Sequence, residues 1–200
     1  TSAHGKSLAE VIRLNGNNAY AYFNRAMARF FTGDTLGSME DYSQVIRLDP
    51  KNALSYYNRA LLKSQLGLLK EAVADYDKVL LINPNNIYTY YNRGVAKHEL
   101  NDYKGAISDY TKAIELCPDF IGSYLNRSDA RKQSGDEKGA YLDYQKAYRI
   151  MQNVNIGKLD SALMVKRYTD STYLDKIIEF EADFITYTED ELAGYQAIDL

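Results

Sequence analysis

A four-residue pattern, Tyr-x-Asn-Arg, occurs four times in this chain at a constant spacing of 34 residues. A fixed period of this length predicts an array of equal structural units, each packed against its neighbours. An Asp-Tyr pair and a proline keep the same spacing, although the fourth proline is missing. The Tyr-x-Asn-Arg copies begin at Tyr22, Tyr56, Tyr90 and Tyr124, the Asp-Tyr pairs at Asp41, Asp75, Asp109 and Asp143, and the prolines are Pro50, Pro84 and Pro118.

Each unit is expected to consist of two helices joined by a tight turn. Glycine or asparagine stands at the middle of every unit, and both residues tolerate the positive φ that ends a helix. An aspartate follows in most units and can cap the next helix. The proline then stops the second helix, except in the fourth unit, where Gln152 takes its place. The four turns are Gly33-Asp34, Gly67-Leu68, Asn101-Asp102 and Gly135-Asp136.

Together, Tyr-x-Asn-Arg followed by a small residue, the mid-unit glycine and the closing proline resemble the tetratricopeptide repeat, as in bacterial repeat-containing proteins. The resemblance implies an all-α fold, a right-handed solenoid of antiparallel helix pairs, with capping helices at its C-terminal end. It places four tandem units in residues 19–154, with the bounds 19–52, 53–86, 87–120 and 121–154. The small residues are Ala26, Ala60, Gly94 and Ser128.

The two ends of the chain depart from the period. Residues 1–18 align with the second half of a unit, so they are expected to form the second helix of a truncated repeat or an N-terminal capping helix. Residues 155–200 hold 10 of the 27 acidic side chains but only 4 of the 24 basic ones. This acidic segment is expected to form a helical cap and tail. An alternative is that Tyr168 to Tyr195 folds back and occupies the binding groove.

Composition and motifs exclude several function classes. The only histidines are His4 and His98 and the only cysteine is Cys117, so no metal-ligand cluster is expected, and no phosphate-binding loop or nucleophile motif is present. We therefore expect no enzyme activity, cofactor or metal. A net charge of −3 without a basic stripe argues against nucleic acid. No apolar run is long enough to span a membrane, and no signal indicates a compartment.

In the family that the chain resembles, one side of each first helix lines a concave groove. One sub-family binds a C-terminal carboxylate there with Lys and Arg, but aromatic and apolar residues occupy those positions here, so we reject that mode. Another, the superhelix of the O-linked N-acetylglucosamine transferase, holds extended peptides with a ladder of asparagines. The matching residues are Asn24, Asn58, Asn92 and Asn126.

Two interpretations of these groove positions stay open. The asparagines either pair with a peptide backbone or bond only the neighbouring helix, and at least half of the aromatic residues are expected in the core. The candidate peptide-binding residues are Tyr20, Phe23, Asn24, Met27, Tyr57, Asn58, Leu61, Tyr88, Tyr91, Asn92, Val95 and Asn126.

The remaining members of the Tyr-x-Asn-Arg pattern are expected to be structural. An arginine in a helix interface needs a partner, because desolvating an unpaired charge costs several kcal/mol. The co-repeating aspartates predict one Arg–Asp pair per unit, and the tyrosines of the pattern are expected in the core. The arginines are Arg25, Arg59, Arg93 and Arg127.

The sequence thus predicts a non-catalytic module that binds a peptide or a helix of a partner protein on its concave face. A self-associating structural scaffold, forming a homo-oligomer through the open ends of the array, is the first alternative. The second is a regulatory repeat region of a larger enzyme. The identity of the partner does not follow from any residue pattern.

Overall fold

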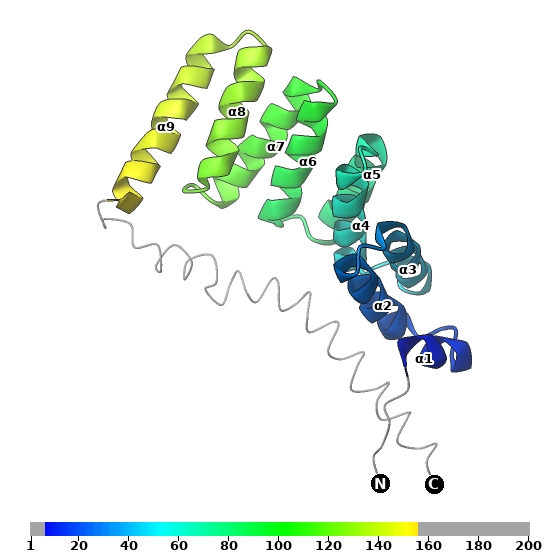
Figure 1. Ribbon diagram of the computed structural model, residues 1–200. Coiled ribbons are helices and arrows are strands. Elements are labelled where there is room, and N and C mark those ends of the chain that lie inside the picture. Colours follow the sequence, from blue (N-terminus) through cyan, green and yellow to red (C-terminus); the bar gives the residue numbers. More distant parts are fainter. Residues whose placement is uncertain (1–6, 156–200) are drawn as a thin grey trace. The chain divides into compact units, whose positions relative to one another are not determined.

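The computed structural model describes residues 7–155, which are entirely α-helical outside their turns (Figure 1). The all-α fold of antiparallel helix pairs is therefore confirmed, whereas the capping helices predicted within 155–200 lie outside the described residues. The helices are α1 (Leu8–Leu14), α2 (Ala19–Phe31), α3 (Thr35–Leu48), α4 (Ala53–Gln65), α5 (Leu69–Ile82), α6 (Ile87–Glu99), α7 (Tyr103–Leu116), α8 (Ile121–Gln133) and α9 (Glu137–Asn155).

The chain divides into two compact units, with a boundary after Pro50. The described part of the first unit holds α1 and the pair α2–α3. The second unit holds the pairs α4–α5, α6–α7 and α8–α9, and within it α6 and α8 also pack against α5 and α7, the second helices of the preceding pairs. The second unit therefore contains three consecutive helix pairs in mutual contact.

The turns within the pairs have the expected chemistry. The residue that ends each first helix has positive φ, from +63° at Asn101 to +87° at Gly135. Asp34, Asp102 and Asp136 then each accept a hydrogen bond from a backbone N–H three residues on. Leu68 provides no such cap in the second pair. The prediction of a left-handed turn residue followed by a cap is therefore confirmed in three of the four turns.

The first helices also begin at side-chain caps, which the sequence analysis did not identify. Asn18, Asn52 and Asn86 each accept a hydrogen bond from a backbone N–H of the first turn of α2, α4 or α6. At the corresponding position before α8 stands Phe120, which cannot cap. This departure from the period places an aromatic ring at the start of the fourth pair.

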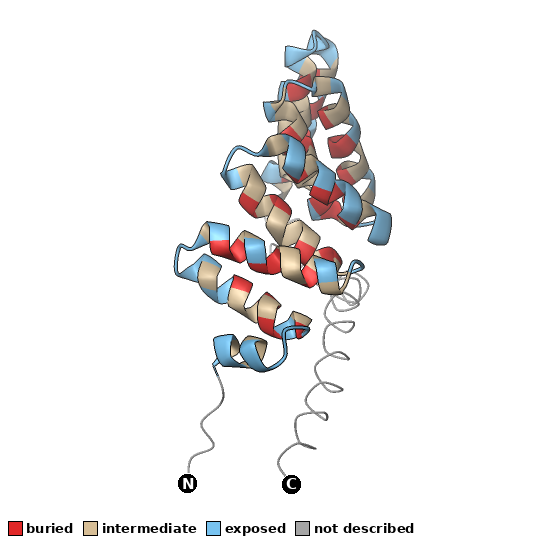
Figure 2. Cartoon of the chain, turned by 90° about the vertical axis from the view of Figure 1, so that its right-hand side faces the viewer, coloured by how far each residue is buried: buried red, intermediate tan, exposed pale blue. Residues whose placement is uncertain are grey.

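Figure 2 shows where the buried residues lie along the helices. In each of the first three pairs, small residues and one tyrosine form this core. In the second unit, Ala60 and Ala72 pack around Tyr76, and Ala106 and Ala130 pack around Tyr110. Both tyrosines are fully buried. The small residues allow the helix backbones to approach, and the tyrosine rings fill the space between them.

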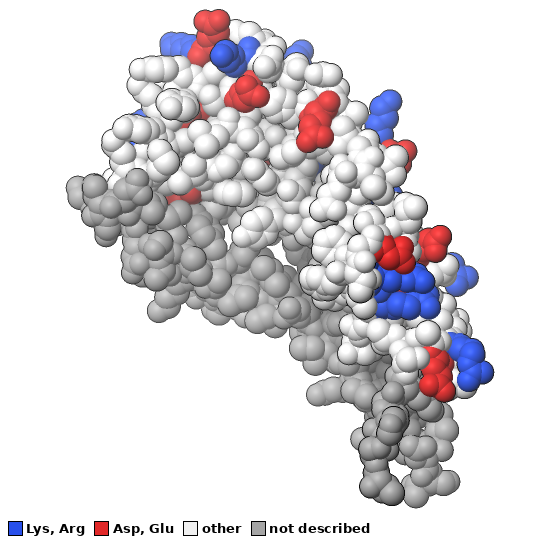
Figure 3. Space-filling view, in the orientation of Figure 1, with Lys and Arg blue, Asp and Glu red and all other residues white. Residues whose placement is uncertain are grey.

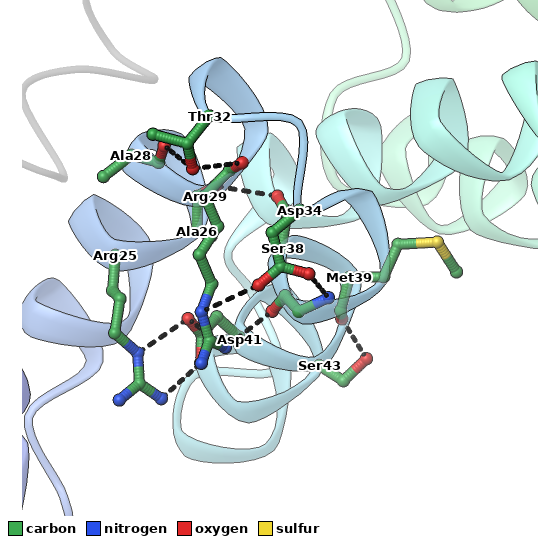
Figure 4. A network of polar contacts seen from close by, with 11 residues as sticks. Arg25, Ala26, Ala28, Arg29, Thr32, Asp34, Ser38, Met39, Asp41 and Ser43 are labelled. Carbon is green, nitrogen blue, oxygen red and sulfur yellow. Dashed lines mark hydrogen bonds and ion pairs between the residues drawn. The ribbon is translucent and has the colours of Figure 1, made fainter.

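An ion cluster fixes each pair, with a buried aspartate at its centre. In the first unit, the guanidinium of Arg25 binds both carboxylate oxygens of Asp41 at 2.7 and 2.8 Å, and Arg29 adds a third bond at 2.9 Å (Figure 4). The predicted Arg–Asp pair is therefore confirmed, and the second cation is an addition. The corresponding clusters are Arg59, Lys63 and Asp75; Arg93, Lys97 and Asp109; and Arg127, Arg131 and Asp143.

The tyrosines of the Tyr-x-Asn-Arg pattern lie partly outside the core. Tyr124 is buried, but Tyr22, Tyr56 and Tyr90 are half-buried, so the prediction of a core position is wrong for these three. Each ring instead packs against the guanidinium three residues later, with centroid distances of 5.4 to 5.7 Å. A tyrosine can cover this cation with its ring face while its edge stays in contact with solvent.

The last helix of the second unit differs from the other second helices. α9 has 19 residues, whereas α3, α5 and α7 have 14 each. Gln152 replaces the proline that follows the other second helices, so nothing interrupts the backbone hydrogen bonds at this point. Tyr144, which corresponds to the buried Tyr76 and Tyr110, is 58% exposed because no further pair covers it within residues 7–155.

Candidate functional site

The candidate site in the second unit lies on one side of its three first helices. We call this side the first-helix face and define it by the residues in corresponding positions of α4, α6 and α8. It consists of Tyr57, Asn58 and Leu61 on α4, Tyr88, Tyr91, Asn92 and Val95 on α6, and Leu125 and Asn126 on α8.

Asparagine and tyrosine side chains link neighbouring first helices across this face. The amide of Asn92 donates a hydrogen bond to the Tyr57 hydroxyl at 2.8 Å, and the amide of Asn126 donates to the Tyr91 hydroxyl at 3.1 Å. Each asparagine therefore bonds the preceding pair, as one of the two open interpretations required. Because an amide also carries an acceptor oxygen, this bond does not use up its hydrogen-bonding capacity.

The tyrosines of these bonds belong partly to the core. Tyr57 packs edge-on against Tyr76 at 6.0 Å between centroids, and Tyr91 lies 6.0 Å from Tyr110. Burial raises the pKa of Tyr57 above its ordinary value, since the charged form would lose its hydration. The rings of Tyr57 and Tyr91 therefore contact the core tyrosines, while their hydroxyls accept hydrogen bonds from the asparagines.

An aromatic cluster at the start of α8 was not predicted from the sequence. The Phe120 ring lies 4.8 Å from that of Tyr91 and 6.2 Å from that of Tyr88. Tyr88 remains 43% exposed. The sequence contained one sign of this cluster, because Phe120 stands where the other units have their capping asparagine. A residue that departs from the period in this way does not share the capping role.

The candidates on α2 belong to the first unit and divide between core and surface. Phe23 is only 3% exposed and packs edge-on against Tyr42. It therefore offers no surface to a ligand in this structure. Tyr20 and Met27 are 37% and 39% exposed, and Asn24 is half-buried. These three stay predicted contacts, as do the residues of the first-helix face.

A polar pocket opens where α6, α7 and α8 meet. It has a volume of about 400 Å³ and is lined by Val95, His98 and Glu99 from α6, by Tyr110 from α7, and by Asn126 and Gln133 from α8. Val95 and Asn126 are also part of the first-helix face. The pocket therefore continues this face toward the turns between the helices.

Charged groups of both signs lie on the face of the molecule drawn in Figure 3. On the side seen in Figure 3, Lys and Arg lie beside Asp and Glu among larger areas of uncharged atoms. No group of three or more His, Cys, Asp or Glu residues within 7–155 is arranged to hold a metal ion. In the same part of the chain, no helix is long and apolar enough to cross a membrane.

Comparison with known families gives a consistent assignment of the helix pairs. Models described as "Tetratricopeptide repeat" match residues 19–52, 53–86 and 87–120, which together make up half of the chain. Residues 121–154 are matched by neither, although α8 and α9 form a pair of the same kind. No curated protein matches the chain in sequence.

Several solved structures share the fold. "Crystal structure of MamA protein" superposes with a TM-score of 0.72 at 20% identity, over 76% of this chain and 83% of that chain. "MamA 41-end from Desulfovibrio magneticus RS-1" gives 0.68 at 20% identity, over 72% and 82% of the two chains. "MamA AMB-1 P212121" gives 0.67 at 21% identity, over 72% and 86%. At such identities the similarity concerns the helical architecture alone.

Proposed function

Because this chain belongs to the tetratricopeptide repeat family, we propose that it binds an extended segment of a partner protein on the first-helix face. The family and the fold make it a protein-interaction or scaffold module, and folds of this type are typically non-catalytic. The proposal adds a surface and a kind of ligand. It adds no partner identity.

The observation that carries the proposal is the mixture of groups on the first-helix face. Tyr88 and Leu125 are 43% and 42% exposed, and they lie on the same helices as Asn92 and Asn126, which bond the preceding pair. Apolar surface of this kind marks interaction sites in soluble proteins. An extended peptide supplies both apolar side chains and unpaired backbone groups, so it matches both components.

Asn92 and Asn126 are suited to bind such a backbone. Each holds its amide in place with one bond to a tyrosine hydroxyl, which fixes the orientation of the carbonyl oxygen on the same side chain. A fixed acceptor loses less conformational entropy on binding than a free side chain does. A peptide N–H can therefore donate to it at little additional cost.

The test uses peptides selected from a random display library against the full 200-residue chain. Binding of a selected peptide is measured by fluorescence anisotropy for the wild type and for the double variant Asn58→Ala, Asn92→Ala. Loss of two hydrogen bonds of about 1 kcal/mol each predicts a Kd that is roughly thirtyfold weaker. The matched control changes Lys78 and Glu115, exposed residues of second helices, to Ala.

Unchanged affinity in the asparagine variant would assign these side chains a purely structural role. A loss of affinity in the control variant of the same size would place the peptide on the second helices instead. Circular dichroism of both variants checks that the fold is retained, since Asn92→Ala also removes the bond to Tyr57.

A second candidate function, a self-associating scaffold, rests on the outer face of α9. Large apolar side chains are exposed there, and a second copy of the chain would bury them. Sedimentation equilibrium over a concentration series should then show mass above that of the 22.8 kDa monomer. Tyr144→Ser with Tyr148→Ser should restore the monomer. The exposed residues of this face are Tyr141, Tyr144, Tyr148 and Met151.

A further inference from the structure

The pocket between α6, α7 and α8 contains a buried polar group without a hydrogen-bond partner. Tyr110 is 0% exposed in its side chain and backbone together, yet its hydroxyl makes no hydrogen bond. Asn126 lies beside this hydroxyl and counteracts part of the rise that burial causes in its pKa, but the Asn126 amide donates its hydrogen bond to the Tyr91 hydroxyl at 3.1 Å. A buried hydroxyl that is left unpaired lowers the stability of the fold, because it has lost its hydrogen bonds to water. The lost free energy is recovered if a ligand group bonds it.

One carboxylate, that of the exposed Glu99, lines this pocket. Burial raises the pKa of the Tyr110 hydroxyl, and Glu99 adds the smallest of several further contributions. A second carboxylate, that of Asp129, lies 3.4 Å from the Nε2 atom of His98 at the pocket wall. Two carboxylates near one neutral or singly charged imidazole favour a cation in the pocket.

The polar groups of the lining are rich in acceptors. The Tyr110 hydroxyl and the Glu99 carboxylate accept hydrogen bonds, and Gln133 adds a carboxamide oxygen. Lysine and arginine side chains are donors only, with three and five N–H groups respectively. A volume of about 400 Å³ is large enough to admit either side chain with its aliphatic stem against Val95.

We propose that this pocket binds a basic side chain, Lys or Arg, of the segment that occupies the first-helix face. The inference rests on the proposed function, because Val95 and Asn126 line both surfaces. The pocket thereby selects Lys or Arg at one position of the bound segment. The asparagines of the first-helix face, in contrast, bind the backbone of any sequence.

The preceding pair shows what is special about this site. Tyr76 corresponds to Tyr110 and is also fully buried with an unpaired hydroxyl, but its neighbour at the His98 position is Ser64. At the position of Glu99 stands Gln65, which carries no charge. The negative charge therefore distinguishes the third pair, and Tyr76 serves as an internal control.

The experiment uses fluorescent seven-residue peptide pools whose central residue is fixed as Lys, Arg, Gln, norleucine or Glu and whose other positions are uncharged and random. Binding to the full chain is measured by anisotropy. The Lys and Arg pools should bind about tenfold more tightly than the Gln and norleucine pools, as expected for charge-assisted hydrogen bonds. The Glu pool should bind most weakly.

Two variants and two controls locate the effect. Tyr110→Phe should keep or raise the unfolding midpoint, since it removes an unpaired hydroxyl, and should reduce the Lys preference severalfold. Glu99→Gln should reduce it about tenfold. Tyr76→Phe and Glu115→Gln make the same chemical changes outside the pocket and should leave the preference intact.

Pools that all bind equally, with an affinity lowered by Asn58→Ala and Asn92→Ala, would overturn the basic-side-chain inference and leave the proposed function standing. Absence of binding by every pool would overturn both. A Lys preference that survives Tyr110→Phe and Glu99→Gln would place the recognition of charge elsewhere. Binding of lysine amide as tight as that of the Lys pool would replace the partner segment with a free amine.

Discussion

The ion clusters and the first-helix face of the second unit occupy the same helices but obey different rules. Every cluster has the same composition, a buried aspartate with one arginine and one further cation. The first-helix face changes from pair to pair, with Tyr57, Tyr91 and Leu125 in one corresponding position. Uniform positions therefore define the scaffold, and variable positions are the ones that can distinguish ligands.

The largest effect is expected at an ion cluster, and Arg93 allows a matched test. Its guanidinium binds buried Asp109 at 2.6 Å and also the exposed Asp77 at 2.6 Å. Asp109→Ala leaves Arg93 and Lys97 without their buried counter-ion, so it should lower the free energy of unfolding by about 3–5 kcal/mol. Asp77→Ala should cost at most about 1 kcal/mol. Urea unfolding of both variants measures the difference.

Equal effects of the two substitutions would contradict the assignment of the buried aspartate as the centre of the cluster. The buried aspartates, which are the same in every pair, would then be no more important to the fold than surface charges are.

A smaller effect is expected where a helix of the scaffold approaches a tyrosine ring. A Cβ atom added at Gly94 would lie 2.7 Å from a ring carbon of Tyr110, whereas one added at Gly122 would lie 3.3 Å from the nearest atom. Gly94→Ala should destabilise the chain by about 1–3 kcal/mol through overpacking. Gly122→Ala should be neutral or slightly stabilising, because alanine is the better helix former. A higher melting temperature for Gly94→Ala would refute the close contact.

The helix caps should contribute about 1 kcal/mol each. Asp102→Ala removes the hydrogen bond from the Gly105 N–H and should lower the free energy of unfolding by about 0.5–2 kcal/mol. Leu68→Asp should raise it by a similar amount, since the second pair lacks this cap. Thermal unfolding followed by circular dichroism tests both signs. Opposite results would show that the turn, and not the cap, sets the start of the second helix.

The smallest effect on stability is expected on the first-helix face. Leu125 is 42% exposed, so Leu125→Ser should change the free energy of unfolding by no more than about 0.5 kcal/mol. The same substitution should weaken binding of a selected peptide, because it removes exposed apolar surface. A large loss of stability would show that Leu125 supports the fold. The ion clusters and the first-helix face would then not differ in their contribution to stability.

The period of 34 residues predicted much of the fold but little of the site. It located the helix pairs, the turns and the Arg–Asp pairs, since each depends on contacts that recur in every unit. The second cation of each cluster, such as Lys97, was also periodic, but only the packing of the pairs shows that it reaches the aspartate. The half-buried state of Tyr56 and Tyr90 followed from stacking on arginine, which the sequence does not specify.

The candidate site depends on residues that depart from the repeat. The roles of Phe120 and His98 depend on the residues that lie beside them in the folded chain. No pattern in a single sequence specifies these neighbours. The pocket beside Tyr110 is an example, because Tyr76 has the same place in the period and also an unpaired hydroxyl, and the two differ only in the residues around them. The binding face thus stays a prediction, as do the bounds of the fourth unit.

The absence of a proline in the fourth unit has a consequence for how the array can grow. First helices begin at residues 19, 53 and 87 and at 121, so the next would begin at 155. Residue 155 is still part of α9, which therefore occupies the position where a fifth unit would start. In each of the first three units, the proline ends the second helix, so that the next unit begins 34 residues after the preceding one. Without it at Gln152, α9 continues to Asn155, and the 34-residue register of the preceding units is not repeated at that residue.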